Sequence, residues 1–100
     1  MYKHIFVHID QGNLTVTLIS AKNLKAADKS GTSDPYVKFT VNGEVVYKSA
    51  TIKKTINPIW KGETFQVPIV SRVTASFRIE VFDWNQMSGD VPLGNRRINK

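Results

Sequence analysis

The middle of the chain reads Tyr36-Val37-Lys38-Phe39-Thr40-Val41-Asn42-Gly43. Every second residue from 37 to 41 is apolar, which is the period-two pattern of a strand with one buried face. The dipeptide Asn42-Gly43 favours a two-residue hairpin turn, because both positions of that turn need positive φ. The pattern therefore predicts an antiparallel hairpin whose second strand runs over residues 44–52.

The same alternation recurs on both sides of this hairpin. It predicts strands in seven segments: 5–9, 14–19, 36–41, 44–52, 64–69, 76–82 and 93–98. Turn residues separate the segments, and none has a convincing helical pattern. Short strands at regular spacing are typical of an antiparallel sandwich, so we expect an all-β sandwich that forms one domain over residues 1–100.

Composition excludes several classes of protein. The chain has 100 residues, of which 41% are hydrophobic, and this suits a single globular core. It has no cysteine, so neither a disulfide framework nor a thiolate zinc site holds it together. The net charge of +6 favours a polyanionic partner, with charge for solubility as the alternative. Tyr36 and Trp84 are too few aromatic residues for a base-stacking surface, so we expect no nucleic-acid partner.

Acidic residues concentrate in two loop-like segments. Together these loops hold six oxygen donors that suit a hard cation: Asp28, Asp34, Asp83, Asn85, Ser88 and Asp90. Calcium takes about 6–8 oxygen ligands, and two loops at one end of a sandwich can supply them. Asp and Asn also populate ordinary turns, so the spacing alone leaves both interpretations open. No nucleophile–base arrangement accompanies the carboxylates, and we expect the chain not to be an enzyme.

Four groups of residues occur in a fixed order along the chain. They are Leu14-Thr15-Val16-Thr17-Leu18-Ile19-Ser20-Ala21-Lys22-Asn23-Leu24, Ser33-Asp34-Pro35-Tyr36-Val37-Lys38, Thr55-Ile56-Asn57-Pro58-Ile59-Trp60, and Val81-Phe82-Asp83-Trp84 with Leu93-Gly94. Together they cover roughly residues 12–95 and resemble a C2 domain. The string Asn23-Leu24-Lys25-Ala26-Ala27-Asp28 is similar to the branch of the family found in tricalbins and extended synaptotagmins.

The resemblance implies an eight-stranded, antiparallel Greek-key sandwich that binds phospholipid headgroups, often through calcium held by loop aspartates. The two aspartates of the first loop match the family's first-loop ligands, and Asp83 matches the first ligand of the last loop. Asn85 stands where the family has a second aspartate. Val91 stands where the family has its last ligand aspartate, and Asp90 is displaced from that place by one position. Because calcium affinity follows the number and charge of the ligands, we expect weakened binding, with one ion or none.

The resemblance also implies a basic face for lipid. Tyr36, Lys38, Lys48 and Trp84 match positions that contact phosphoinositide headgroups in C2 domains resembling those of conventional protein kinase C, whereas Ala50 replaces a second lysine. Two lysines follow on the same segment, and a methionine lies at the loop apex, where it either inserts into the membrane or is simply exposed. The expected lipid-binding set is Tyr36, Lys38, Lys48, Lys53, Lys54, Trp84 and Met87.

We therefore expect a membrane-docking module for phosphatidylserine and phosphoinositides, with weakened calcium dependence. It would act on the cytosolic side of membranes and, by resemblance to tricalbins, at contact sites between the endoplasmic reticulum and the plasma membrane. The alternative is a calcium-independent C2-fold scaffold whose lysines meet acidic protein segments. The family's eighth strand has no counterpart before Lys100, so we expect either a fragment of a larger protein or an open sheet edge at which a second copy pairs.

Overall fold

The computed structural model describes residues 2–10, 12–27, 31–68, 76–85 and 89–98. Seven strands lie within them: β1 (Tyr2–Asp10), β2 (Asn13–Lys22), β3 (Pro35–Val41), β4 (Glu44–Lys48), β5 (Ile59–Pro68), β6 (Phe77–Asp83) and β7 (Val91–Ile98). All strand pairs are antiparallel, which confirms the predicted all-β class. No helix long and apolar enough to cross a membrane occurs in this part of the chain.

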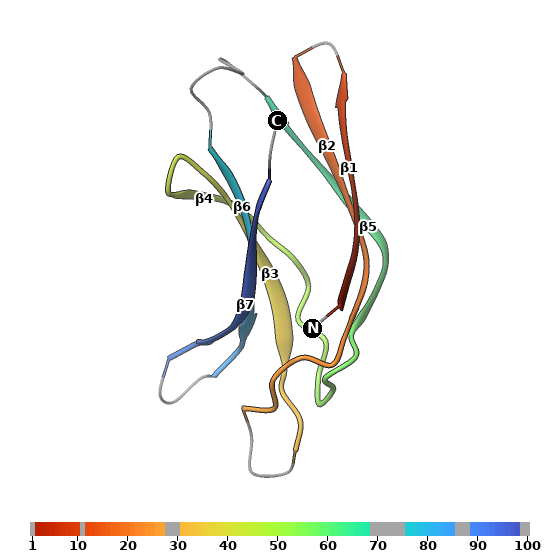
Figure 1. Ribbon diagram of the computed structural model, residues 1–100, viewed down its shortest axis with the longest axis vertical. Helices are drawn as coiled ribbons and strands as arrows, with labels where there is room; N and C mark the ends of the chain where they lie inside the picture. The colour runs from red at the N-terminus through yellow and green to blue at the C-terminus, as the bar shows by residue number, and fades with distance from the viewer. Residues whose placement is uncertain (1, 11, 28–30, 69–75, 86–88, 99–100) are drawn as a thin grey trace.

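The strands form two sheets that face each other (Figure 1). One has the order β1-β2-β5 and the other has the order β4-β3-β6-β7. On β3, Val37 and Phe39 are fully buried and Val41 packs against the core, as the alternation predicts. Inward side chains from both sheets form the core: Leu14, Val16, Leu18, Ala21, Leu24, Val37, Phe39, Trp60, Phe65, Val67, Phe77, Ile79, Val81 and Leu93.

The predicted hairpin joins β3 to β4. Asn42 and Gly43 have φ of 51° and 81°, which are the positive values that this turn needs. The predicted end of the second strand is wrong, because β4 stops at Lys48. Beyond it, Ser49 N–H donates to Val37 C=O and Ile52 N–H donates to Pro35 C=O, both at 2.9 Å. Residues 49–52 therefore follow β3 as an irregular continuation.

Strand β5 begins at Ile59, five residues before its predicted start at 64. Lys61 and Gly62 have φ of 57° and 79°, and the pairing of β5 with β2 shifts register at this point. Such a bulge breaks the period-two pattern, so the sequence conceals the first half of the strand. Trp60, just before the bulge, is buried in the core, and its Nε1–H donates to Ala50 C=O at 3.0 Å.

The segment before β5 holds the end of β2 in place. The side-chain Oδ1 of Asn57 accepts the N–H of Asn23, which itself has a φ of 56°. Leu24 N–H donates to Ile56 C=O at 3.0 Å, which continues the contact by one residue. This segment, the β2–β3 loop and the β6–β7 loop all lie at the same end of the sandwich (Figure 1). The predicted gathering of the acidic loops at one end is therefore present.

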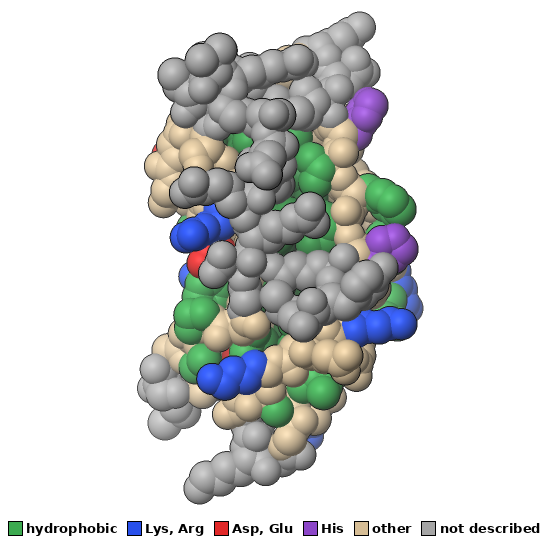
Figure 2. Space-filling model, in the orientation of Figure 1, with side chains coloured by type: hydrophobic (Ala, Val, Ile, Leu, Met, Phe, Trp, Pro, Cys, Tyr) green, Lys and Arg blue, Asp and Glu red, His purple; other side chains and the backbone are tan. Residues whose placement is uncertain are grey.

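Strand β1 has one neighbour, β2, among the described residues. The side chains of Phe6 and Val7 on this strand are exposed at 59% and 38%. Figure 2 shows histidine side chains along one margin of the molecule with hydrophobic side chains exposed between them. Self-association through an open sheet edge stays a prediction.

Two isoleucines allow a matched test of the core. Ile79 is 2% exposed and Ile59 is 60% exposed, although both lie on strands. We expect Ile79→Ala to lower the free energy of unfolding by about 2–5 kcal/mol, because it removes buried methyl groups and leaves a cavity. Ile59→Ala should cost less than about 1 kcal/mol. Urea unfolding of both variants measures the difference, and equal losses would contradict the described packing.

Candidate functional site

Asp34 and Asp83 meet at the loop end of the sandwich. Asp83 is the last residue of β6 and is 1% exposed, and its Oδ1 accepts the backbone N–H of Asp34 at 2.7 Å. The Oδ1 of Asp34 accepts the backbone N–H of Lys54 at 2.7 Å. The carbonyl of Asp34 accepts the N–H of Trp84 at 2.9 Å. Two residues predicted as calcium ligands are thus brought together, and Lys54 contributes its backbone here.

The loop that leads to Asp34 is fixed by Ser33. The Ser33 hydroxyl is fully buried, accepts the N–H of Ala27 and donates to the carbonyl of Lys25, both at 2.9 Å. The Ser33 carbonyl accepts the N–H of Thr55 at 2.8 Å. Sequence reasoning placed Ser33 in a motif without giving it a role. The only sequence feature that could have indicated this structural role is its place as a small hydroxyl residue before Asp-Pro in a polar loop.

Part of the predicted set of calcium ligands lies within the described residues. Asp34, Asp83 and Asn85 carry the hard oxygen donors that calcium prefers, but the ion needs about 6–8 such ligands. Within the described ranges, no group of three or more His, Cys, Asp or Glu side chains is placed to share an ion. Asp28, Ser88 and Met87 lie outside the described residues. The donor chemistry fits calcium, and the number of donors described falls short of a complete site.

Three of the predicted lipid-binding residues surround one hollow on the outer face of the four-stranded sheet. The hollow has a volume of about 240 Å³. Its lining is Tyr36, Lys48, Ser49, Thr51, Trp84 and Asp90. Tyr36 is 4% exposed, whereas Trp84 is 39% exposed at the loop end. We call this feature the basic hollow.

Two further lysines lie against aromatic rings beside the basic hollow. The Nζ of Lys38 is 4.2 Å from the ring centroid of Phe82, which in turn stacks on Tyr36 with centroids 6.0 Å apart. The Nζ of Lys53 is 4.2 Å from the ring centroid of Trp84. Attraction between an ammonium group and a ring face holds both lysine heads near the hollow. Sequence reasoning missed Phe82, although β3–β6 pairing places it opposite Tyr36.

Asp90 belongs to the basic hollow in this structure. Its Oδ2 accepts a hydrogen bond from the Tyr36 hydroxyl and its Oδ1 accepts the N–H of Asn85 at 3.0 Å. The role of Asp90 as a calcium ligand stays a prediction. The bond from Tyr36 is the main cause that lowers the pKa of Asp90 below its ordinary value, and Lys38 and Lys48 lower it further. Burial raises the pKa of Tyr36 above its usual range, and the bond to Asp90 adds to this effect.

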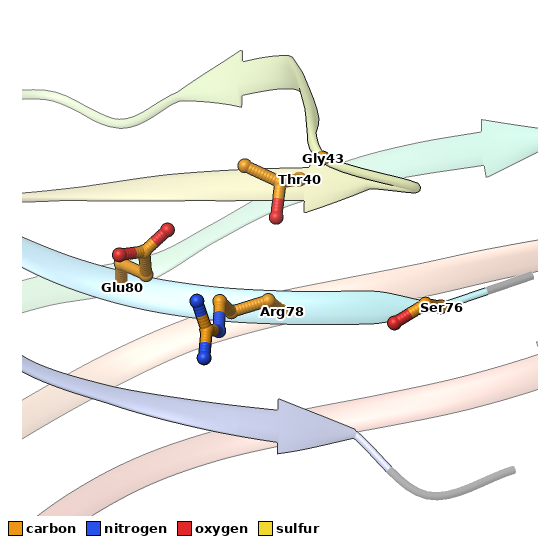
Figure 3. Close-up of a pocket in the computed structure, with 5 residues that line it drawn as sticks. All are labelled: Thr40, Gly43, Ser76, Arg78 and Glu80. Carbon is orange, nitrogen blue, oxygen red and sulfur yellow. The ribbon is translucent and has the colours of Figure 1, made fainter.

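A second polar hollow lies on the same sheet near the β3–β4 hairpin. It has a volume of about 330 Å³ and is lined by Thr40, Gly43, Ser76, Arg78 and Glu80. Figure 3 shows Arg78 and Glu80 extending from β6 and Thr40 from β3. Its lining has one cation, Arg78, and one anion, Glu80. The lining of the basic hollow also has one of each, Lys48 and Asp90, and its basic character comes from two further lysines beside it. In Figure 2, Lys and Arg side chains lie at separate points of the visible face.

This antiparallel sandwich, with paired aspartates in the loops at one end, has the architecture of a C2 domain. The family model for the C2 domain matches residues 12–100, and the chain belongs to the C2 domain family. Tricalbin-1 of Saccharomyces cerevisiae is 41% identical over 91 residues, which make up 89% of this chain and 8% of tricalbin-1. The chain therefore spans a small part of that relative's length.

Solved structures agree with this assignment. A C2 domain of plant extended synaptotagmin 1 matches with a TM-score of 0.77 and 26% identity, covering 87% of this chain and 67% of that one. A calcium-bound structure of two C2 domains of extended synaptotagmin 2 matches with a TM-score of 0.75 and 27% identity, covering 91% of this chain and 35% of that one. The resemblance to C2 domains of tricalbins and extended synaptotagmins is confirmed.

The role of Asp83 in the fold can be separated from its charge. We expect Asp83→Ala to lower the free energy of unfolding by about 1–3 kcal/mol, because the N–H of Asp34 loses its acceptor. Asp83→Asn keeps an oxygen at that place and should cost clearly less. Urea unfolding without calcium compares the two variants, and equal losses would show that the hydrogen bond does not hold the loops.

Proposed function

We propose that this chain is a non-catalytic membrane-docking module that binds anionic phospholipid headgroups at the basic hollow. The observation that carries the proposal is the placement of Tyr36, Lys48 and Trp84 around one hollow, with Lys38 and Lys53 held beside it on aromatic rings. Ammonium groups attract phosphate oxygens, and a half-exposed indole suits the boundary between water and lipid. Membership of the C2 domain family supports the same interpretation.

The strength of docking follows from the number of lysines. Each lysine near an anionic leaflet contributes about 1 kcal/mol, so Lys38, Lys48 and Lys53 together give about 3 kcal/mol. Such binding is weak, depends on salt, and gains from further modules in one chain. Likeness to tricalbin-1 supports a place on the cytosolic side of membranes and at membrane contact sites, which we include in the proposal.

Calcium has a secondary part in this proposal. Asp34 and Asp83 are the two carboxylates in place, and Asp28, Asn85 and Ser88 would complete the set of donors. With an amide in place of a second carboxylate at 85, we propose weak binding of one ion. The calcium-bound structure of extended synaptotagmin 2 is a related precedent.

Charge reversal at the basic hollow tests lipid docking. We expect Lys38→Glu with Lys48→Glu to abolish sedimentation with vesicles that contain phosphoinositide, because the face becomes repulsive to phosphate. Lys22→Glu with Lys61→Glu is the matched control: it makes the same change in net charge at exposed positions on the other sheet. Raising the salt concentration should weaken wild-type binding in the same way, since the Debye length is only about 8 Å at physiological salt.

Two results would contradict the lipid proposal. If a calcium chelator releases the wild-type domain while the double lysine variant still sediments with phosphatidylserine vesicles, the aspartate loops are the principal site. If the domain binds acidic peptides but no anionic vesicle, the C2 fold serves here as a protein scaffold.

Calorimetric titration tests the calcium site separately. We expect Asp83→Asn to abolish calcium binding, because two neutral amides at 83 and 85 leave too little charge, while the variant remains folded. Asn85→Asp restores a carboxylate and should tighten binding. Unchanged calcium affinity in both variants would show that these loops are not a cation site.

A further inference from the structure

The Tyr36 hydroxyl already has an anionic partner within the chain. Tyr36 lines the basic hollow and is 4% exposed, and its hydroxyl donates to the Asp90 carboxylate. A hydrogen bond to a carboxylate is stronger than one between neutral groups. A phosphate group that approaches the hollow therefore cannot use this hydroxyl until Asp90 leaves it.

The carboxylate of Asp90 is placed as a bound anion would be. One oxygen accepts from Tyr36, the other accepts from the backbone N–H of Asn85 at 3.0 Å, and Lys48 lines the same hollow. The charges of Lys38 and Lys48 both favour its ionised form. An incoming phosphate would thus meet a negative charge at the point where the positive charges converge.

We propose that Asp90 is an internal anion that occupies the basic hollow, and that a phosphomonoester of a phosphoinositide headgroup must displace it in order to bind there. The inference rests on the proposed function and adds the rule by which that site selects lipids. A phosphomonoester carries more negative charge than a carboxylate and has three acceptor oxygens, so it can compete for Tyr36 and Lys48. A phosphatidylserine headgroup has no phosphomonoester and contacts the lysines only from outside the hollow.

The amide variant Asp90→Asn tests this role, with Glu80→Gln as its matched control. Both variants remove one negative charge from the outer face of the same sheet. Glu80 stands opposite Lys38 in the β3–β6 register but lines the second hollow instead of the basic one. We expect Asp90→Asn to tighten binding to vesicles of phosphatidylcholine with phosphatidylinositol bisphosphate roughly tenfold, the scale of one hydrogen bond to a charged group. Glu80→Gln should tighten it less than about threefold, as expected for a half-buried charge that does not line the basic hollow.

Phosphatidylserine vesicles and soluble inositol trisphosphate provide the other two arms. The two variants should bind phosphatidylserine vesicles equally, because the serine headgroup does not enter the hollow. Inositol trisphosphate, which has the phosphates without a bilayer, should bind Asp90→Asn more tightly than wild type and shift the Trp84 indole resonance. In the wild-type domain, inositol trisphosphate should move the carboxyl carbon resonance of Asp90, a readout that needs no variant.

The outcomes separate this inference from the proposed function. If Asp90→Asn and Glu80→Gln tighten phosphoinositide binding equally, the effect comes from net charge alone and the inference is overturned. This holds even if Lys38→Glu with Lys48→Glu abolishes docking. A saturating trisphosphate titration that leaves the Asp90 carboxyl resonance unmoved would also overturn it. If no anionic vesicle binds the wild-type domain or Asp90→Asn, the proposed function fails. The soluble trisphosphate then still decides whether Asp90 competes with phosphate in the hollow.

Discussion

The hydrogen bond from the Asp34 N–H to the Asp83 carboxylate is the contact on which both candidate sites depend. It joins the residue before β3 to the last residue of β6, and the Asp83 side chain that accepts it is buried. The carbonyl of Asp34 then receives the N–H of Trp84, which borders the basic hollow. The aspartate pair and the lipid face therefore share one backbone framework. Any change in the charge at Asp83 acts on a group only one residue away from the exposed indole.

Much of the fold follows from local patterns in the sequence. Val37, Phe39 and Val41 alternate toward the core, and Asn42-Gly43 turns the chain with the positive φ values that such a turn requires. Two of the strand ends that the sequence predicts wrongly, at 48 and 59, have a common cause. Backbone hydrogen bonds of residues 49 and 52 to β3, and the bulge at 61 and 62, are set by distant partners. A period of two residues carries no information about them.

The sequence also predicts only part of the side-chain arrangement at the candidate site. Tyr36, Lys48 and Trp84 converge as the family resemblance implies, whereas the contribution of Phe82 depends on the register of two strands that are distant in sequence. The partner of Asp90 could not be predicted, because it depends on how the chain between Asp83 and Asp90 returns to β3. Its place in an acidic loop grouped Asp90 with the oxygen donors, although counting residues along the family motif put Val91 at the ligand position. The hydrogen bonds of Asp90 place it among lysines.

A carboxylate among lysines has a physical use in a domain with a net charge of +6. Specificity is a difference between two affinities. In our proposal Asp90 lowers the affinity for a headgroup that enters the basic hollow and does not affect one that contacts the lysines from outside. Entry is therefore left to headgroups whose phosphomonoesters have enough charge and acceptor oxygens to displace a carboxylate. An internal anion thus keeps the Tyr36 hydroxyl paired in the free domain and sets the phosphate charge that is needed to enter the hollow.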